Sequence, residues 1–332
     1  YGSGANAVGE CYNDSAFTTG LDFIVVSVSK PNSATLTVAD GEGHDGTYGT
    51  GVTINSVASN VIRYRDAIVP LTINHIELTS SGGSVAIRTN RLGVYKRMLV
   101  HNCISLFITE GGQEPATLMN SFLYSSTTGP NCLGHRNYNN TIYNMTNDGV
   151  TNAVAANGGV IKNTISVGNG GEDFDTATAQ DESFCISSDT TASGTGSLTN
   201  KTATNLFVSI VGGSEDLHLK SGADAIGAGT DLAATPDGVQ YDINGSNRNA
   251  LTATVWDIGG HQYASTASIG TSSRDYSTMT LWEADLNDTT IYGAGGNAVG
   301  ECYNDSDFDE TVAISDAAIP DTATLTAAEG EK

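Results

Sequence analysis

Positive charge is scarce in this 332-residue chain, in which 14 Lys and Arg stand against 37 Asp and Glu and the net charge is −23 at pH 7. A surface this acidic repels nucleic-acid phosphates and anionic membranes, so we expect neither as a partner. No stretch approaches the roughly 18 consecutive apolar residues of a membrane helix, so no membrane insertion is expected. We expect an acidic surface that tolerates salt or divalent cations. The simpler alternative is that the charge only keeps a secreted protein soluble.

Proline and strong helix formers are also few. The chain has 6 Pro but 39 Gly, and Ser, Thr and Asn are frequent, which favours short strands joined by many turns. The cysteines are Cys11, Cys103, Cys132, Cys185 and Cys302. They form no Cys-x-x-Cys pair and no zinc-spaced cluster with His. We therefore interpret them as buried core residues, with a disulfide framework as the less favoured alternative.

The opening segment of the chain is repeated near its end. Residues 1–17 read YGSGANAVGECYNDSAF and residues 292–308 read YGAGGNAVGECYNDSDF, with 14 of 17 positions identical. Residues 33–42 return more weakly at 322–331. The chain thus holds about one period of a tandem array and the start of the next. We expect self-assembly to involve the repeated residues and one residue just before them: Tyr292, Asn297, Val299, Cys302, Tyr303, Phe308 and Trp282.

A shorter period follows, to about residue 169, where Asn-x-(Ile/Phe/Val) recurs six times. Its asparagines are Asn55, Asn74, Asn102, Asn120, Asn140 and Asn163. A period of about 20 to 25 residues without helices is typical of a β-solenoid, whose stacked coils bury one continuous apolar column. Asn tolerates the αL bend between strands, so we expect the six to form a ladder of amide hydrogen bonds. Chance recurrence is the alternative, and the pattern of leucine-rich repeats is absent.

Residues 205–263 carry an ordered series of motifs. They are NLFV at 205–208, SEDLHL at 214–219, SGADAIGAGT at 221–230, DINGSNR at 242–248 and WDIGGHQY at 256–263. This series resembles the C-terminal closing segment of secreted right-handed parallel β-helix proteins with the pectate-lyase-like fold. Gly227 stands where that family has Asp, Asn244 replaces its second Asp, and His261-Gln262 replaces Tyr-Glu.

The resemblance implies an all-β, right-handed parallel β-helix in an extracellular or cell-surface protein. It implies no single activity, because the same fold occurs in polysaccharide lyases, adhesins and surface proteins. We divide the chain into five segments. They are 1–42, the first strands of a module; 43–210, the β-helix coils; 211–263, the closing segment; 264–270, a linker; and 271–332, the capping helix and first strands of the next module.

The capping helix is expected near residues 277–287. Thr280-x-x-Glu283 fits a capping box, and Leu281, Trp282 and Leu286 would form one apolar face. A solenoid needs such a cap because its open end exposes apolar surface and unpaired strand edges.

Residues that could carry chemistry are few. Asp242, Asn244 and Ser246 offer oxygen ligands at alternate positions, as at the start of a calcium loop, so calcium is a possible cofactor; the alternative is an Asx-stabilised turn. The densest acidic cluster is Glu172, Asp173 and Asp175, which could do acid/base work in a cleft but is more simply a solvated loop. His75 and His101 lie on opposite sides of their Asn sites, which argues against a shared metal. No nucleophile elbow, P-loop or metal-binding His pair is present.

Three functions remain, and the leading one is structural. Tandem β-helix modules, each capped by the next, would form a stiff extracellular filament whose partner is another copy of the same module. The first alternative is an adhesin that binds surface carbohydrate through exposed aromatics such as Tyr124, Tyr138 and Tyr143. The second is a polysaccharide lyase or hydrolase, for which no catalytic motif is found.

Overall fold

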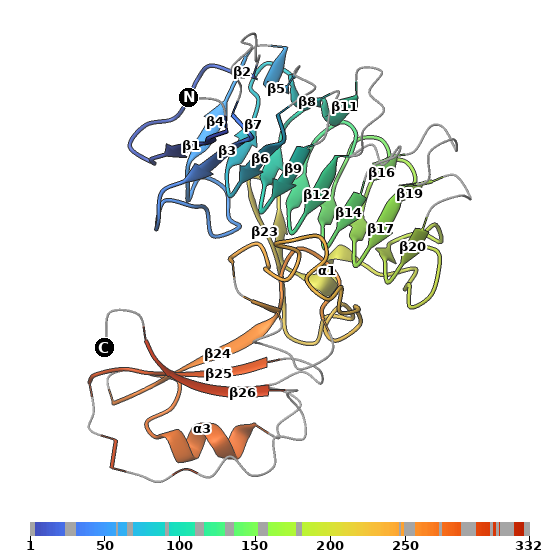
Figure 1. The fold of residues 1–332 in the computed structure, drawn as a ribbon. Helices are drawn as coiled ribbons and strands as arrows, with labels where there is room; N and C mark the ends of the chain where they lie inside the picture. Colours follow the sequence, from blue (N-terminus) through green and yellow to red (C-terminus); the bar gives the residue numbers. More distant parts are fainter. Residues whose placement is uncertain are drawn as a thin grey trace.

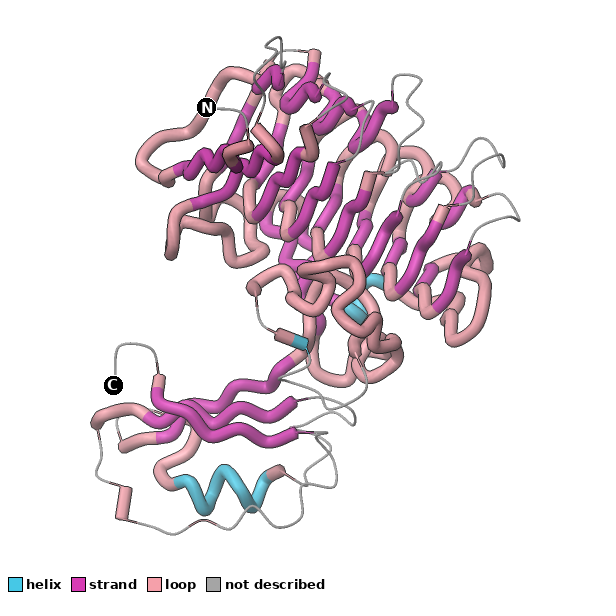
Figure 2. Tube along the Cα trace, viewed as in Figure 1, coloured by secondary structure: helices cyan, strands magenta, loops and turns pink. Residues whose placement is uncertain are grey.

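The computed structural model describes most of the chain. The described residues are 4–23, 31–57, 59–64, 69–89, 93–109, 116–129, 136–151, 159–176, 181–245, 247–248, 256–271, 274–286, 297–305, 308–309, 312 and 322–328. They form an all-β parallel β-solenoid of stacked coils and a smaller second unit of three strands and a helix (Figures 1 and 2). The fold class predicted from the sequence is confirmed.

Three parallel sheets line the solenoid. The first has eight strands, in the order β1 (Asn6–Cys11), β3 (Ser33–Val38), β6 (Leu71–Asn74), β9 (Gly93–Lys96), β12 (Thr117–Met119), β14 (Arg136–Tyr138), β17 (Val160–Lys162) and β20 (Asp181–Ser183). The second has seven, in the order β21 (Ile186–Ser187), β18 (Ile165–Val167), β15 (Thr141–Tyr143), β13 (Phe122–Tyr124), β10 (Leu99–His101), β7 (Glu77–Thr79) and β4 (Thr53–Asn55). The third has four, namely β11 (Ser105–Thr109), β8 (Val85–Thr89), β5 (Asn60–Tyr64) and β2 (Leu21–Phe23). A short parallel pair is formed by β16 (Val150–Thr151) and β19 (Phe174–Asp175).

The register between coils explains the short sequence period. In the first sheet Tyr95 pairs with Ile73 and with Leu118, which lie 22 and 23 residues away along the chain. In the second sheet the middle residues of five adjacent strands form one inward column with at most 1% exposure: Ile54, Leu78, Val100, Leu123 and Ile142. Burial of one such side chain contributes roughly 1.5–3 kcal/mol. On the next two strands the same position is held by Ser166 and Ser187, so the apolar column ends there.

A closing segment covers the outer face of the second sheet. It begins with α1 (Ala203–Leu206) and an antiparallel hairpin of β22 (Phe207–Val211) and β23 (Ser214–Leu219). Leu217 and Leu219 of the hairpin pack with the outward residues Phe122 and Ile165. The coils therefore end earlier than the predicted residue 210, because β21 is the last coil strand and α1 already belongs to the cover.

The motifs that resemble the β-helix family meet in the closing segment. Arg248 is fully buried and donates to Gln262 Oε1 at 3.2 Å and to Gly259 C=O at 2.9 Å. Asp257 accepts from Tyr263 N–H at 2.6 Å. Burial raises the pKa of Asp257 to about 7 and lowers the pKa of Arg248 to about 10. These hydrogen bonds hold the last residues of the closing segment together.

The second unit is a parallel sheet with a helix against it (Figure 1). Its elements are β24 (Ala264–Ile269), α3 (Met279–Asp285), β25 (Asn297–Cys302) and β26 (Thr322–Ala327). The predicted linker at 264–270 is wrong, because β24 pairs with β25 along its whole length. Small side chains obscure the alternation of apolar and polar residues along β24, yet Ala267 and Ile269 are buried.

Helix α3 confirms the expected position but has a different cap. Thr278, not Thr280, is the N-cap, and its hydroxyl accepts from Leu281 N–H at 3.1 Å. That cap places Leu281 rather than an acidic residue at the third helical position, so no capping box forms. Trp282 and Leu286 are buried as predicted, whereas Leu281 is 51% exposed. None of the described helices has the length and apolar character needed to span a bilayer.

Three of the described cysteines are buried. Cys11, Cys103 and Cys185 have no disulfide partner among the described residues, and Cys302 is half-buried. Burial raises the pKa of Cys103 to about 12 and raises that of Cys185 as well. Such thiols act as small core residues. Cys132 lies outside the described residues.

Candidate functional site

One corner of the solenoid, between the first and second sheets, is built from left-handed residues. The residue after each of six first-sheet strands has φ between 51° and 65°: His75, Arg97, Asn120, Asn139, Asn163 and Phe184. A residue in this conformation turns the chain sharply into the next strand. The corner therefore stacks one side chain from each coil above that of the next, with His75 and Arg97 on adjacent coils.

Three asparagines of this corner form a ladder. Asn139 Nδ2 donates to Asn120 Oδ1 at 2.9 Å, and Asn163 Nδ2 donates to Asn139 Oδ1 at 3.0 Å. All three are 0% exposed. Of the six predicted residues only Asn120 and Asn163 belong to this ladder; the rung between them is Asn139, not Asn140, because Asn139 is the αL residue of its coil. Asn140 instead bonds the backbone of the preceding coil.

The other three predicted rungs lie elsewhere. Asn55 and Asn74 are the last residues of β4 and β6. Asn102 is an αL residue, with φ 56°, at the corner that follows the second sheet. Asn-x-Ile therefore marks strand ends at more than one corner, and the six asparagines do not share one column.

A glycine-rich loop, residues 39–51, folds over the first corner. A Cβ added to Gly43 would lie 1.9 Å from the His75 ring, and one added to Gly46, where φ is 89°, would lie 2.7 Å from the His218 ring. Only glycine permits this approach. The loop therefore lies against the coils on one side and the closing segment on the other.

His44 fixes this loop to the corner as a neutral imidazole. It is 1% exposed; its Nδ1 accepts from Gly46 N–H at 3.2 Å and its Nε2 donates to Arg97 C=O at 2.9 Å. Burial, with the neighbouring His75, lowers the pKa of His44 to about 3. His75 Nε2 donates to His44 C=O at 2.6 Å, so this nitrogen carries the proton and cannot accept a hydrogen bond from the Arg97 Nη atom 3.1 Å away. Burial and Arg97 lower the pKa of His75 to about 4.

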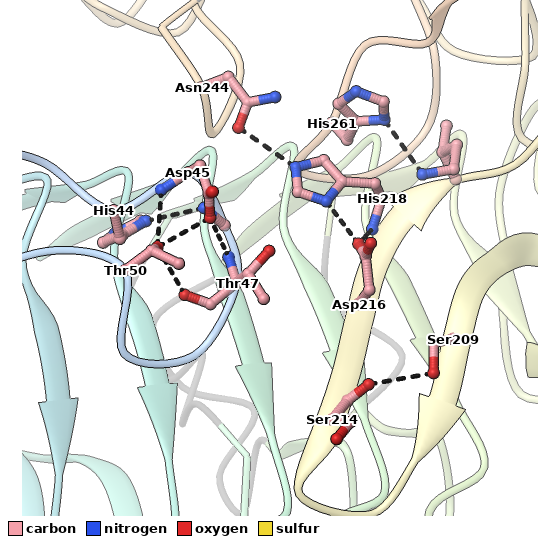
Figure 3. A network of polar contacts seen from close by, with 12 residues as sticks. His44, Asp45, Thr47, Thr50, Ser209, Ser214, Asp216, His218, Asn244 and His261 are labelled. Atoms are coloured by element: carbon pink, nitrogen blue, oxygen red, sulfur yellow. Dashed lines mark hydrogen bonds and ion pairs between the residues drawn. The ribbon is translucent and has the colours of Figure 1, made fainter.

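The closing segment contributes a histidine of the opposite kind (Figure 3). His218 Nδ1 lies 2.5 Å from Asp216 Oδ1, and its Nε2 lies 3.2 Å from Asn244 Oδ1. Burial lowers the pKa of His218, but the hydrogen bond and charge of Asp216 outweigh burial and raise it above its ordinary value. His261 lies edge-on to His218 with ring centres 4.7 Å apart, and burial holds the pKa of His261 well below its usual range.

A polar cavity of about 520 Å³ lies where the loop, the corner and the closing segment meet. Its charged and imidazole groups come from Asp40, His44, Asp45, His75 and Arg97. Arg97 also donates from Nε to Ile243 C=O at 3.0 Å, which ties the corner to the closing segment. The cavity offers positively and negatively charged groups to a small polar molecule. Its walls connect the loop, the corner and the closing segment.

The predicted calcium ligands do not converge in the described structure. Asp242 is 1% exposed and its Oδ2 accepts from Gln262 N–H at 3.2 Å. Asn244 Oδ1 instead lies toward His218, and Ser246 lies outside the described residues. Within the described part of the chain, no three His, Cys, Asp or Glu side chains are grouped to hold a metal. Calcium binding stays a prediction.

The acidic cluster lies at the last coils. Asp173 is 1% exposed; its Oδ1 accepts from Asn169 Nδ2 at 2.6 Å, and its Oδ2 accepts from the Ser188 amide at 2.6 Å and the Asp189 amide at 3.2 Å. Glu172 and Asp175 are exposed, and none of the described Arg or Lys residues forms an ion pair with the three. Asp173 therefore organises the chain locally, and the described structure gives no cleft chemistry to this cluster.

Two of the tyrosines expected to be exposed are buried. Tyr124 is 3% exposed and Tyr138 is 9% exposed, while Tyr143 is half-buried. Tyr124 pairs with Tyr143 on the next coil and with His101 on the coil before. His101 and Tyr124 also stack, with ring centres 5.2 Å apart. Their spacing along the chain, 23 and 19 residues, was the available signal for this column.

The residues predicted for self-assembly gather in the second unit. Asn297, Val299 and Cys302 belong to β25, and Phe308 packs in one cluster with Trp282. The Tyr303 ring lies 3.5 Å below the Arg274 guanidinium. Tyr292 lies outside the described residues.

No protein-family model matches the chain, and neither a curated protein nor a solved structure matches it significantly.

Proposed function

We propose that the chain is a segment of an extracellular filament or surface fibre in which β-solenoid modules follow one another end to end. The modules would belong to one covalent chain or to separate subunits. In either case β24 and α3 of one module cover the open first edge of the next. Three features of the described residues support this proposal.

The first feature is that the repeated sequence has one structure in both places. Strands β1 and β25 have the same sequence, NAVGEC. Asn6 of β1 lies opposite Ser33 of β3, and Asn297 of β25 lies opposite Thr322 of β26, at the corresponding step. The residue that follows the second strand makes the same hydrogen bond in both places. Ala39 N–H donates to Cys11 C=O at 3.0 Å, and Ala328 N–H donates to Cys302 C=O at 3.0 Å. The second unit therefore has the form of a module's beginning.

The second feature, which carries the proposal, is a difference in cover. β25 lies between β24 and β26, whereas β1 is the edge strand of its sheet and, among the described strands, pairs with β3 alone. Ala298 and Gly300 are buried, while their counterparts Ala7 and Gly9 are half-buried and exposed. Val8 is 52% exposed, but its counterpart Val299 is half-buried. Phe17 is likewise 38% exposed, where Phe308 packs against the helix cluster.

The third feature is the opposite edge. β3 pairs with β6 and continues into the coils, whereas β26 is the last strand of its sheet among the described residues. Leu325 of β26 is accordingly 39% exposed, while its counterpart Leu36 packs on the solenoid core. An open strand edge with apolar side chains favours pairing with another strand. Each unit thus has an edge that a neighbouring module would complete.

Electron microscopy of the native material tests this proposal. We expect rods or filaments with an axial repeat of one module. Compact monomers without an axial repeat would contradict it.

A second candidate, carbohydrate binding, is favoured by one observation. His101, Tyr124 and Tyr143 occupy matching positions on three adjacent coils, and the first two line a cavity in which a sugar could contact them. A glycan array with the native protein tests it, and an array without hits counts against it.

A further inference from the structure

A second cavity, of about 380 Å³, lies between the turn of the β22–β23 hairpin and the corner that follows the second sheet. Its side chains come from three parts of the chain: Tyr48, His101, Asn102, Tyr124, Asn144 and Glu215. No Lys or Arg is among the residues that line it. The cavity is separate from the second unit, so an inference about it does not depend on the assembly proposed above.

Aromatic rings form the walls of this cavity. His101 stacks on Tyr124 with an interplanar angle of 12°, and Tyr48 stands edge-on to His101 with ring centres 4.9 Å apart. The His101 Nδ1 atom lies 2.8 Å from Asn102 Nδ2, which donates to it, and Nε2 lies 2.8 Å from Glu77 Oε1. These contacts assign the ring proton to Nε2. The walls therefore present ring surface, and no Lys or Arg lines them.

A buried carboxylate faces this aromatic surface without a counter-ion. Glu215 is 5% exposed, and its oxygens accept from Ser125 Oγ at 3.0 Å and from Gly213 N–H at 2.8 Å. None of the described basic side chains forms an ion pair with it. A carboxylate has about four acceptor positions, so two remain. A buried charge is ordinarily paired, and none of the described residues supplies the cation.

The Tyr124 hydroxyl is a second, independent sign of a ligand. Tyr124 is 3% exposed, and its hydroxyl is buried without a hydrogen-bond partner among the described residues. Burial raises its pKa, and so do the charges of Glu215 and Glu77 and the neighbouring Tyr48. Tyr124, Tyr48 and Glu215 all line the same cavity. A buried phenol that lacks a partner loses the free energy of a hydrogen bond that a ligand could supply.

We propose that this cavity binds a primary ammonium group. Such a group has three N–H donors and one positive charge. It would donate to the Glu215 carboxylate, to the Tyr124 hydroxyl oxygen and to an amide oxygen of Asn102 or Asn144, while the Tyr48 and Tyr124 rings attract the charge. An anionic ligand would be repelled by the Glu215 carboxylate, and no Lys or Arg lines the cavity to bind it. The volume suits an amino sugar or a small aliphatic amine.

Binding of glucosamine and of glucose to the intact chain, measured by calorimetry at about pH 6 where an amine is protonated, tests this inference. The two sugars differ only in the ammonium or hydroxyl group. We expect glucosamine to bind at least about tenfold more tightly than glucose. Equal affinities would assign the cavity to neutral polyols, and no binding of glucosamine would also overturn the inference.

Three variants locate the site. Glu215→Gln removes the charge but keeps one oxygen, which can accept from Gly213 N–H while the amide nitrogen donates to the Ser125 hydroxyl. It should weaken glucosamine binding by about tenfold or more. Tyr124→Phe keeps the ring and should weaken it about three- to tenfold. Glu172→Gln removes an exposed carboxylate elsewhere and should leave the affinity unchanged. Unchanged binding by Glu215→Gln with native circular dichroism would refute the assignment.

Discussion

The neutral state of His44 makes the solenoid sensitive to acid in a way that a single substitution can isolate. His44 has a pKa of about 3 in the folded chain, against about 6.5 in an unfolded chain. A depressed pKa contributes stability that is present above the unfolded value and is lost as pH falls toward the folded value. Between pH 7.5 and pH 4.5 the unfolded chain gains a proton at this site and the folded chain does not. The loss is about 3 kcal/mol at about 1.4 kcal/mol per pH unit.

The same acidification affects other buried groups, so the wild-type profile alone does not test His44. Asp257, with a folded pKa of about 7, takes up a proton in the folded state first and stabilises it over the same interval by a similar amount. His75 acts in the same direction as His44, and Arg97 and Asp45 are the other charged groups that influence the His44 ring. The difference between two proteins that share all these groups removes their contributions.

His44→Gln provides that difference, because its amide can still donate to Arg97 C=O but does not titrate. The free energy of unfolding in urea, followed by circular dichroism, would be measured at about pH 7.5 and about pH 4.5 for both proteins. We expect the variant to be less stable at the higher pH, since a buried packed ring is lost. Its further loss on acidification should be smaller than that of the wild type by about 3 kcal/mol. Equal acid losses in the two proteins would refute the neutral, buried state of His44.

Three other substitutions have definite expected outcomes. His218→Gln should show the opposite pH dependence of stability from His44→Gln, because Asp216 raises the pKa of His218. The protonated ring stabilises the fold below the ordinary pKa of histidine, and the substitution removes that stability. The variant should therefore lose more stability at about pH 5 than at about pH 8 in the same urea assay. Asn139→Ala should lower the free energy of unfolding by about 2–4 kcal/mol, because two ladder hydrogen bonds are broken and an alanine is placed at φ 51°. Asn139→Gly should recover about 1 kcal/mol of this loss, measured by thermal unfolding. Equal losses in the two variants would mean that the αL conformation does not matter. Trp282→Ala should destabilise the second unit by about 3–5 kcal/mol, seen as faster hydrogen exchange in β24 and β25 with the solenoid coils unchanged, and uniform loss of protection would contradict the independence of the two units.

The sequence was sufficient for the solenoid but not for its corners. Alternating apolar residues and a period near 22 predict stacked coils, because each coil must bury its inward face against the next. The choice between Asn139 and Asn140 at the corner depends on the pairing register, which local sequence does not specify. His75 and Arg97 occupy the same corner position as the ladder asparagines, so the residue type alone does not identify it.

The candidate sites were beyond sequence reasoning for a related reason. His44 and His218 lie 174 residues apart and come into proximity only because the closing segment folds back over the coils. Glu215 and Tyr48 are brought to one cavity in the same way. The small residues of β24 hid a strand whose partner is supplied by the repeat. The repeat itself was visible at once, since 14 of 17 positions are identical.

The most direct test of the proposed assembly is a cryo-electron microscopy map of the native filament at side-chain resolution. The account predicts a strand with the sequence of β24 beside the open edge of β1, with Ala264 opposite Asn6 as it lies opposite Asn297 in the second unit, and a helix with the buried tryptophan of α3 over Ala7 and Gly9. A map in which β1 faces solvent, or pairs with an unrelated element, would contradict it.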